Sequence, residues 1–317
     1  MIASPILVTG SSGFIGSHLV RSLVAAGAAV TGLCSSRSPV APPAGLTYAR
    51  AELRDPQALA ALFAATPFRT VFHLAAHGVQ QENDGGLSTV EVNTLGAFSL
   101  ARAALSVPVE RFIYCGSALE YRPQSEPISE SAPLGSQTLY GASKAAGWLL
   151  LDYLVRMESL PLITVRPFTA FGPGEADTKL IPYVIRNALR GQPMQFTAGT
   201  QIRDYLYVSD AVEALRLAAE KGAPGDVFNI GAGPKGARTV RSIVEAILEI
   251  TGAPASLVRF GDAVRSRKDA ACLVCDPSRA RTQLGWKQQV SFEAGLKETI
   301  EWYRSEGNTE GSRRANS

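Results

Sequence analysis

The feature that most constrains the fold is a glycine loop near the N-terminus. An apolar run over residues 6–9 is typical of a buried strand, and the apolar positions of residues 19–24 follow helical spacing. Between them lie Gly10, Gly13 and Gly16, in the spacing Gly-x-x-Gly-x-x-Gly. Glycines let a backbone approach a pyrophosphate closely, and the N-terminus of a helix supplies free N–H groups and positive potential. Strand, glycine loop and helix in this order therefore predict a dinucleotide-binding site.

Strands and helices alternate through the first half of the chain. This alternation predicts an α/β fold, a doubly wound parallel sheet of the Rossmann type with helices on both faces. Ligands of such sheets bind beyond the carboxyl ends of the strands, where we expect Gly10, Ser35, Ala76 and Ser117. The expected strands are residues 6–9, 29–34, 70–75, 111–115 and 162–165, and the expected helices are residues 55–65, 90–104 and 140–158.

A tyrosine and a lysine four residues apart indicate the chemistry. Tyr140 and Lys144 lie one turn apart on one face of the helix expected from residue 140. A phenol has an ordinary pKa of about 10 and is a poor base at neutral pH. Because a neighbouring ammonium group favours the phenolate, we expect the pair to pass a proton to or from an alcohol or a ketone. An ordinary surface helix can show the same spacing, so the glycine loop gives the pair its meaning.

Short motifs follow one another in a fixed order along nearly the whole chain. They are Thr9-Gly10-x-x-Gly13-x-x-Gly16, His73-Leu74-Ala75-Ala76, Asn93, Gly116-Ser117, Tyr140-x-x-x-Lys144, Arg166-Pro167, Gly172-Pro173-Gly174, Arg203-Asp204-Tyr205, Asn229-Ile230-Gly231 and Gly285-Trp286. In this order they resemble the extended branch of the short-chain dehydrogenase/reductase superfamily, which contains nucleotide-sugar epimerases, dehydratases and reductases.

The resemblance implies a division into two domains. Residues 1–168 form the dinucleotide-binding domain, to which residues 205–231 return. Residues 169–204 and 232–304 form a smaller C-terminal α/β substrate domain. Residues 305–317 are a polar tail that we expect to be disordered.

The end of the second strand indicates which nicotinamide cofactor is used. Folds that bind NAD place an acidic residue there, which holds the ribose 2′-hydroxyl group. Here Cys34 takes that position, and two serines and Arg37 follow it. A guanidinium group and two hydroxyl groups suit a 2′-phosphate, so we predict NADP(H) in preference to NAD(H); the alternative is that Arg37 is a solvated loop charge. With the resemblance, the expected cofactor contacts are Gly10, Ser12, Gly13, Phe14, Ile15, Gly16, Ser35, Ser36, Arg37, Glu52, Leu53, Leu74, Ala75, Ala76, Asn93, Tyr140, Lys144 and Pro167.

The absence of a carboxylate two residues after Ser117 reduces the number of possible reactions. By resemblance, Ser117 supplies the hydroxyl group that joins Tyr140 in holding the sugar oxygen. Sugar 4,6-dehydratases and nucleotide-hexuronate decarboxylases of this branch carry a glutamate two places later, where this chain has Leu119. Glu120 comes next, but on an extended chain it would face away from the substrate, an argument that fails if the segment bulges. We therefore disfavour dehydration and decarboxylation.

Two reactions remain that need only Ser117, Tyr140 and Lys144. A 4-epimerase keeps its cofactor and usually has NAD and an acidic strand end, which this chain lacks. A 4-ketoreductase exchanges its cofactor and suits Arg37. We therefore expect NADPH-dependent reduction of a nucleotide-linked 4-keto-6-deoxyhexose, in deoxysugar biosynthesis. The alternatives are a 4-epimerase with tightly bound NAD(P) and a non-catalytic NADP(H)-binding regulatory protein.

The resemblance also implies contacts to the nucleotide-sugar substrate. Arg203 corresponds to an arginine that holds the nucleotide diphosphate, and a guanidinium fork suits phosphate geometry. The alternative for Arg203 is a salt bridge to Asp204 or Asp210. Arg265 or Arg267 should supply a second diphosphate contact. The expected substrate contacts are Ser117, Ala118, Leu119, Glu120, Thr169, Lys179, Arg203, Arg265 and Arg267.

Charge and hydropathy argue against other classes of protein. The net charge of +3 is spread along the chain without a basic block, so we expect no nucleic-acid partner. No apolar run reaches the roughly 18 residues of a membrane span, and the chain leads straight into a strand rather than a signal peptide. We therefore expect no membrane contact and a cytoplasmic location.

Cysteines and histidines give no sign of a metal site. Cys272 and Cys275 have the spacing of one half of a zinc site, but no second pair exists. In a strand, residues three apart face opposite sides, so we expect packing cysteines rather than ligands. His18, His73 and His77 are expected to be structural.

Two helices carry more apolar residues than one buried face needs. The helix of residues 140–158 includes Leu149, Leu150, Tyr153 and Leu154. Relatives pair this helix and the helix of residues 90–104 with the same helices of a second subunit. We therefore expect a homodimer through a four-helix contact, although a buried core helix would show the same pattern.

Overall fold

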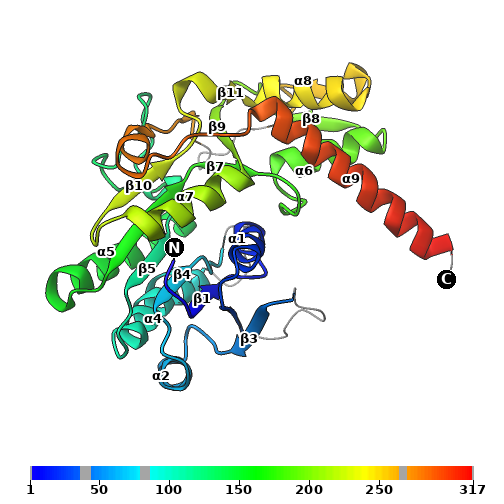
Figure 1. The fold of residues 1–317 in the computed structure, drawn as a ribbon. Coiled ribbons are helices and arrows are strands. Elements are labelled where there is room, and N and C mark those ends of the chain that lie inside the picture. The colour runs from blue at the N-terminus through cyan, green and yellow to red at the C-terminus, as the bar shows by residue number, and fades with distance from the viewer. Residues whose placement is uncertain (1, 36–43, 79–85, 264–269, 316–317) are drawn as a thin grey trace.

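A seven-stranded sheet forms the centre of the protein, and all of its paired strands are parallel (Figure 1). The structure is a computed structural model that describes residues 2–35, 44–78, 86–263 and 270–315. The doubly wound parallel sheet predicted from the sequence is confirmed. The strand order is β10 (Val227–Ile230), β6 (Leu162–Pro167), β5 (Arg111–Cys115), β4 (Thr70–His73), β1 (Ile6–Thr9), β2 (Val30–Cys34) and β3 (Leu46–Arg50).

Successive residues of β1 belong to two different hydrophobic cores. Ile6 and Val8 pack on one face of the sheet, and Leu7 packs on the other. Because successive side chains of a strand point to opposite faces, an apolar run of this kind must be covered on both sides. Helices α1 (Phe14–Ala25) and α7 (Val208–Lys221) cover the first face, and α2 (Pro56–Ala65), α4 (Ala97–Ala104) and α5 (Leu139–Glu158) cover the second.

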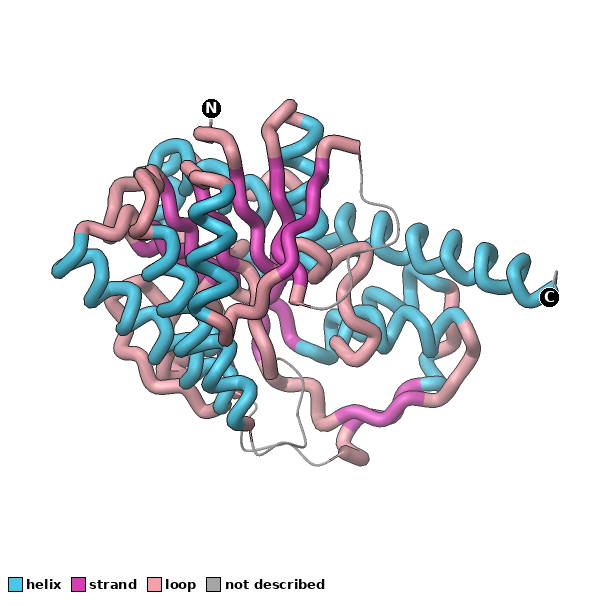
Figure 2. The backbone as a smooth tube through the Cα atoms, turned by 90° about the horizontal axis from the view of Figure 1, so that it is seen from below, coloured by secondary structure: helices cyan, strands magenta, loops and turns pink. Residues whose placement is uncertain are grey.

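The C-terminal region has a hydrophobic core of its own. Phe171, Ile185, Ile243 and Ile300 are fully buried in it. Figure 2 shows this region to one side of the large sheet. Its elements are β7 (Thr169–Phe171), α6 (Leu180–Leu189), β8 (Met194–Phe196), β9 (Ile202–Tyr207), β11 (Ala237–Thr239), α8 (Val240–Thr251), β12 (Val258–Phe260), β13 (Cys272–Leu273) and α9 (Phe292–Ala315). The chain returns to the large sheet between β9 and β11, as α7 and β10.

The C-terminal tail is helical over residues 305–315, whereas the sequence led us to expect disorder. Helix α9 begins at Phe292, and Leu296, Ile300 and Tyr303 anchor its first turns in the core. Once a helix is nucleated, each further residue adds a hydrogen bond at low cost, so polar residues can continue it. Figure 1 shows α9 in red, extending beyond the rest of the C-terminal region. No helix within the described residues is long and apolar enough to cross a membrane.

Candidate active site

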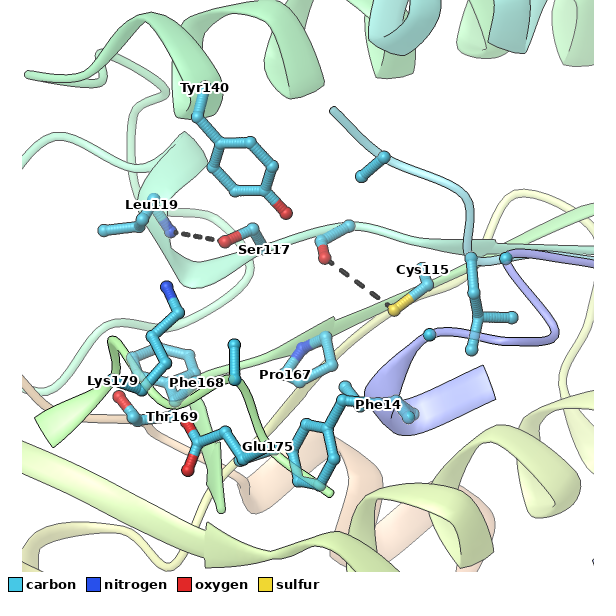
Figure 3. A pocket seen from close by; sticks show the side chains of 18 of the residues that line it. Phe14, Cys115, Ser117, Leu119, Tyr140, Pro167, Phe168, Thr169, Glu175 and Lys179 are labelled. Carbon is cyan, nitrogen blue, oxygen red and sulfur yellow. Dashed lines mark hydrogen bonds between the residues drawn. The ribbon is translucent and has the colours of Figure 1, made fainter. Parts of the chain in front are cut away.

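A pocket of about 860 Å³ lies at the carboxyl edge of the large sheet. The order of the strands reverses between β1 and β4, and doubly wound sheets bind their ligands at such a reversal. The walls of the pocket come from the glycine loop, from the ends of β4, β5 and β6, and from the C-terminal region (Figure 3). A smaller pocket of about 380 Å³ adjoins it and shares Gly10, Ser12, Ala75 and Ala76. The two pockets together suit an elongated ligand.

The glycine loop leaves the first turn of α1 open to an anion. The N–H group of Gly13 donates to the carbonyl oxygen of Gly10 at 2.9 Å, and no side chain caps the helix. A Cβ atom at Gly16 would lie 2.0 Å from the carbonyl oxygen of Gly10, so this close approach requires glycine. Since the N–H groups of a first helical turn lack intrahelical partners, this end of the pocket fits a pyrophosphate. The lining residues of the loop are Gly10, Ser12, Gly13, Phe14, Ile15 and Gly16.

The smaller pocket lies at the ends of β2 and β3, where we expect the adenosine part of the cofactor. Ser36 and Arg37, the expected partners of a 2′-phosphate, lie outside the described residues. Sequence reasoning missed Arg54, which also lines this pocket and forms a 3.2 Å ion pair with Glu91. Arg54 could have been predicted, because it directly follows Glu52 and Leu53, two expected cofactor contacts. The residues of β2, β3 and the segments after them that line the pocket are Cys34, Ser35, Ala51, Glu52, Leu53 and Arg54.

Asn93 lies behind the pocket rather than in it, contrary to our expectation of a cofactor contact. Its side-chain oxygen accepts a hydrogen bond from the N–H group of His77 at 2.8 Å. Its amide group donates to the carbonyl oxygen of His77 at 2.9 Å and to the hydroxyl group of Ser143 at 3.0 Å. Asn93 belongs to a π-helical stretch, η1 (Glu91–Gly96), between α3 (Leu87–Val90) and α4. It therefore joins the segment after β4 to α5, and Leu74, Ala75, Ala76 and Pro167 line the pocket itself.

Ser117 and Tyr140 meet at the wall of the pocket, as Figure 3 shows. The hydroxyl oxygen of Ser117 accepts a hydrogen bond from the N–H group of Leu119 at 3.1 Å, and the hydroxyl group also hydrogen bonds with Tyr140. Thr138 caps α5 by accepting a hydrogen bond from the N–H group of Gly141 at 3.0 Å. A Cβ atom at Gly141 would lie 2.1 Å from the carbonyl oxygen of Leu119. Only glycine therefore lets α5 approach closely enough to bring the two hydroxyl groups together.

Lys144 is fully buried beneath the pocket and does not line it. Its Nζ atom lies 4.1 Å from the centroid of the Tyr114 ring, and burial lowers the pKa of its ammonium group. Burial also raises the pKa of Tyr140 above its ordinary value, and Cys115 and Glu120 raise that pKa further, while a hydrogen bond with Ser117 lowers it. We expected Lys144 to favour the phenolate. Burial is instead the largest influence on this phenol and acts in the opposite direction, so Tyr140 is neutral at neutral pH.

Glu120 does not reach the pocket, so our expectation of a substrate contact is wrong. The premise of an extended chain is also wrong, because Ala118–Glu120 form one 3₁₀ turn, η2. The carboxylate of Glu120 turns back to accept a hydrogen bond from the N–H group of Ser117 at 2.7 Å and one from Nε of Arg166 at 2.7 Å. Glu120 is fully buried and Ala118 nearly so, and neither lines the pocket. Of this turn, only Leu119 faces the ligand space.

Arg166 is the centre of a buried network that the sequence did not reveal. It donates to the hydroxyl oxygen of Tyr121 at 2.9 Å, and Tyr121 donates to the side-chain oxygen of Asn229 at 2.8 Å. Its guanidinium group lies over the rings of Tyr121 and Trp148, 4.9 and 4.7 Å from their centroids. Through Glu120 this network fixes the backbone of the turn that carries Ser117.

The opposite wall of the pocket comes from the C-terminal region. Thr169, Lys179 and Arg203 line it, where we expect the substrate. The acids considered as partners of Arg203 have other roles: Asp204 accepts hydrogen bonds from the N–H groups of Ala232, Gly233 and Cys275, and Asp210 from those of Gln289 and Val290. Arg265 and Arg267 lie outside the described residues. Glu175, which sequence reasoning missed, also lines this wall.

His73 has structural surroundings, whereas His77 lines the smaller pocket. His73 is fully buried, and its Nδ1 atom lies 2.7 Å from the hydroxyl oxygen of Thr9. The same hydroxyl oxygen accepts a hydrogen bond from the N–H group of Ala75 at 3.1 Å, so Thr9 ties His73 to the segment after β4. Burial lowers the pKa of His73 to about 3, so it is neutral. Over the described parts of the chain, no three His, Cys, Asp or Glu residues are placed to hold a metal ion.

Comparison with known proteins shows the family. A family model described as the NAD dependent epimerase/dehydratase family matches residues 6–231. Similar proteins include a probable dTDP-glucose 4,6-dehydratase from Sinorhizobium fredii (32% identity; 95% of this chain and 93% of the relative) and a UDP-glucose 4-epimerase from Mycolicibacterium smegmatis (31%; 94% and 98%). The crystal structure of a dTDP-glucose 4,6-dehydratase double mutant from Streptomyces venezuelae with NAD bound is 28% identical, covers 95% of this chain and 97% of its own, and has a TM-score of 0.86. The chain therefore belongs to the NAD dependent epimerase/dehydratase family.

Proposed function

We propose that the protein reduces the 4-keto group of a nucleotide-linked 4-keto-6-deoxyhexose with NADPH. The observation that carries this proposal is the pairing of a neutral Tyr140 with Ser117, beside Leu119 rather than a carboxylate. Reduction of a ketone needs a proton donor, and the protonated phenol of Tyr140 can supply it. Abstraction of a proton from the sugar's C5, which dehydration requires, needs a base that Leu119 cannot supply.

Each residue of this set has a role in the proposed reaction. Bound NADPH supplies the hydride. Tyr140 donates a proton to the carbonyl oxygen, and the hydroxyl group of Ser117 turns from Tyr140 to donate to the same oxygen and polarise it. Lys144 does not line the pocket, so its role here is electrostatic: its ammonium group stabilises the phenolate of Tyr140 as that charge forms. Arg203 and Lys179 offer positive charge to the nucleotide diphosphate.

A 4-epimerase is the second candidate, because similar proteins include UDP-glucose 4-epimerases and solved relatives bind NAD. An epimerase uses the same Ser117, Tyr140 and Lys144 but retains its cofactor. The absence of a carboxylate from the end of β2, where Cys34 stands, favours the exchange of NADPH over retained NAD. The third candidate is a non-catalytic NADP(H)-binding regulator, and the intact set of Ser117, Tyr140 and Lys144 argues against it.

The proposed function is tested by following cofactor oxidation with nucleotide 4-keto-6-deoxyhexoses of the dTDP, UDP, GDP and CDP series, with NADPH and NADH in parallel. We expect stoichiometric oxidation of NADPH with one of them and slower oxidation of NADH. Interconversion of intact nucleotide sugars without net cofactor oxidation would establish the epimerase instead. Binding of NADPH without turnover of any substrate would favour the regulatory protein.

We also propose that the protein is a homodimer through α5 and the helix that leads into α4. On α5, Leu149, Tyr153 and Met157 are 53%, 47% and 66% exposed. On the neighbouring helix, Leu87 and Leu95 are 65% and 56% exposed. Exposed apolar side chains gathered on two adjacent helices are typical of a surface that a second subunit covers.

Substitution Leu149→Lys should convert this dimer into a monomer, because the ammonium group would be buried in the contact without a partner. Light scattering would give the molar mass of each form. Leu189→Lys, at the exposed end of α6, is the matched control and should leave the mass unchanged. A wild-type protein that is monomeric at micromolar concentration would contradict the proposal.

A further inference from the structure

Glu175 places a carboxyl group in the pocket opposite Tyr140. Figure 3 shows it beside Thr169 and Phe14, with Tyr140 and Ser117 on the far wall. Glu175 comes from the segment between β7 and α6. Its Oε2 atom is buried and has no hydrogen-bond partner among the residues that the structure describes. A buried polar atom without a partner costs free energy, and a ligand in the pocket would supply that partner.

The backbone that carries Glu175 is fastened on both sides. Nε2 of His18, on α1, donates to the carbonyl oxygen of Pro173 at 2.8 Å. The hydroxyl group of Tyr303, on α9, donates to the carbonyl oxygen of Glu175 at 3.2 Å. The N–H group of Glu175 donates to the carbonyl oxygen of Gly172 at 3.3 Å. These hydrogen bonds therefore fix the backbone from which the carboxyl group of Glu175 extends into the pocket.

The surroundings of Glu175 favour an uncharged carboxyl group. Burial raises its pKa to about 8, although the ammonium group of Lys179 lowers it. At neutral pH the group is then a carboxylic acid, which offers one O–H donor and one carbonyl acceptor. A neutral acid does not repel the nucleotide diphosphate that Arg203 and Lys179 would attract. Its two functions match a hydroxyl group, which also both donates and accepts.

We propose that Glu175 recognises the sugar, by a hydrogen bond between its carboxyl group and a hydroxyl group of the hexose. This role rests on the proposed function, since it needs a nucleotide sugar with its keto group at Tyr140. The diphosphate is then bound by Arg203 and Lys179, and Glu175 contributes only to the binding of the sugar. Glu175 is thus a specificity residue and takes no part in proton transfer.

The test compares nucleotide sugars with the same nucleotides lacking the sugar. Isothermal titration calorimetry with saturating NADP⁺ would measure the dissociation constants of dTDP-glucose, UDP-glucose, GDP-mannose and CDP-glucose, and those of dTDP, UDP, GDP and CDP for comparison. For the nucleotide whose sugar form binds most tightly, the dissociation constant of the diphosphate divided by that of the nucleotide sugar gives the contribution of the sugar. We expect Glu175→Ala to lower this ratio about tenfold and to leave nucleoside diphosphate binding unchanged. Glu175→Gln should change the ratio less than about threefold, because an amide also offers both N–H donors and a carbonyl acceptor.

Asp177→Asn is the matched control on the same segment. Its carboxylate forms a 2.8 Å ion pair with Arg186 and does not line the pocket, so the ratio should stay that of the wild type. An unchanged ratio in Glu175→Ala, or a loss of NADP⁺ affinity in place of the lower ratio, would refute the role of Glu175. If the wild type binds none of the four nucleotide sugars more tightly than the matching diphosphates, the role of Glu175 is refuted, whereas the proposed function is decided separately by the oxidation of NADPH with the keto sugars.

Discussion

Replacement of Tyr140 by phenylalanine should lower kcat about 10²- to 10⁴-fold, because the ring stays in place and only the proton donor is lost. The affinity for NADPH should change less than threefold, since the pyrophosphate end of the pocket is built by the glycine loop and not by Tyr140. Stopped-flow turnover and fluorescence titration of NADPH would measure the two effects separately.

Tyr153→Phe is the matched control for this experiment. Tyr153 lies on the same helix, is 47% exposed and does not line either pocket, so loss of its hydroxyl group should leave kcat unchanged. A Tyr140→Phe variant with the turnover of the wild type would show that another group donates the proton, and the proposed mechanism would be abandoned. A variant that loses NADPH affinity to the same extent as kcat would show that the hydroxyl group binds the cofactor.

Substitution Arg166→Met should lower the free energy of unfolding by about 3–5 kcal/mol. The ion pair of Arg166 with Glu120 is almost fully buried, at 2% and 0% side-chain exposure. Removal of one partner leaves the other charge buried without compensation, which costs more than the pair itself contributes. Urea denaturation followed by circular dichroism would measure the change.

Two further variants separate the pair from the rest of the network. The double variant Glu120→Gln with Arg166→Met should recover part of the lost stability, because no buried charge then remains. Arg156→Met, which breaks the exposed 3.1 Å pair with Asp152 on α5, should cost only about 0.3–0.5 kcal/mol. An Arg166→Met variant no less stable than Arg156→Met would mean that the buried pair does not hold the Ser117 turn in place.

Features of the site that depend on neighbouring residues were predictable from the sequence. The glycine loop needs a strand, three glycines and a helix in succession, and all of them are visible within residues 6–24. Tyr140 and Lys144 depend only on the turn of one helix. The alternation of apolar strands and helices was sufficient to predict the parallel sheet, because its crossovers follow the order of the chain.

Features that depend on distant residues were not predictable. The turn of Glu120 is closed by Arg166, which lies 46 residues further along the chain. Glu175 lies on a segment whose backbone is held by His18 at Pro173 and by Tyr303 at Glu175 itself, and neither His18 nor Tyr303 is near it in sequence. The pKa of Tyr140 follows from the burial of the whole site rather than from the lysine one turn away. Burial is a property of the packed fold, so the residue types alone did not indicate its direction.

The contact between Gly141 and the Ser117 turn has a consequence for the evolution of this chain. The distance between the two hydroxyl groups is set where backbone meets backbone, at a position without any functional group of its own. A mutational scan scored by activity would therefore rank Gly141 with the catalytic residues, although it touches no substrate. Substitutions at Thr169 or Glu175, on the pocket wall, leave that contact intact, whereas any side chain at Gly141 would disrupt it.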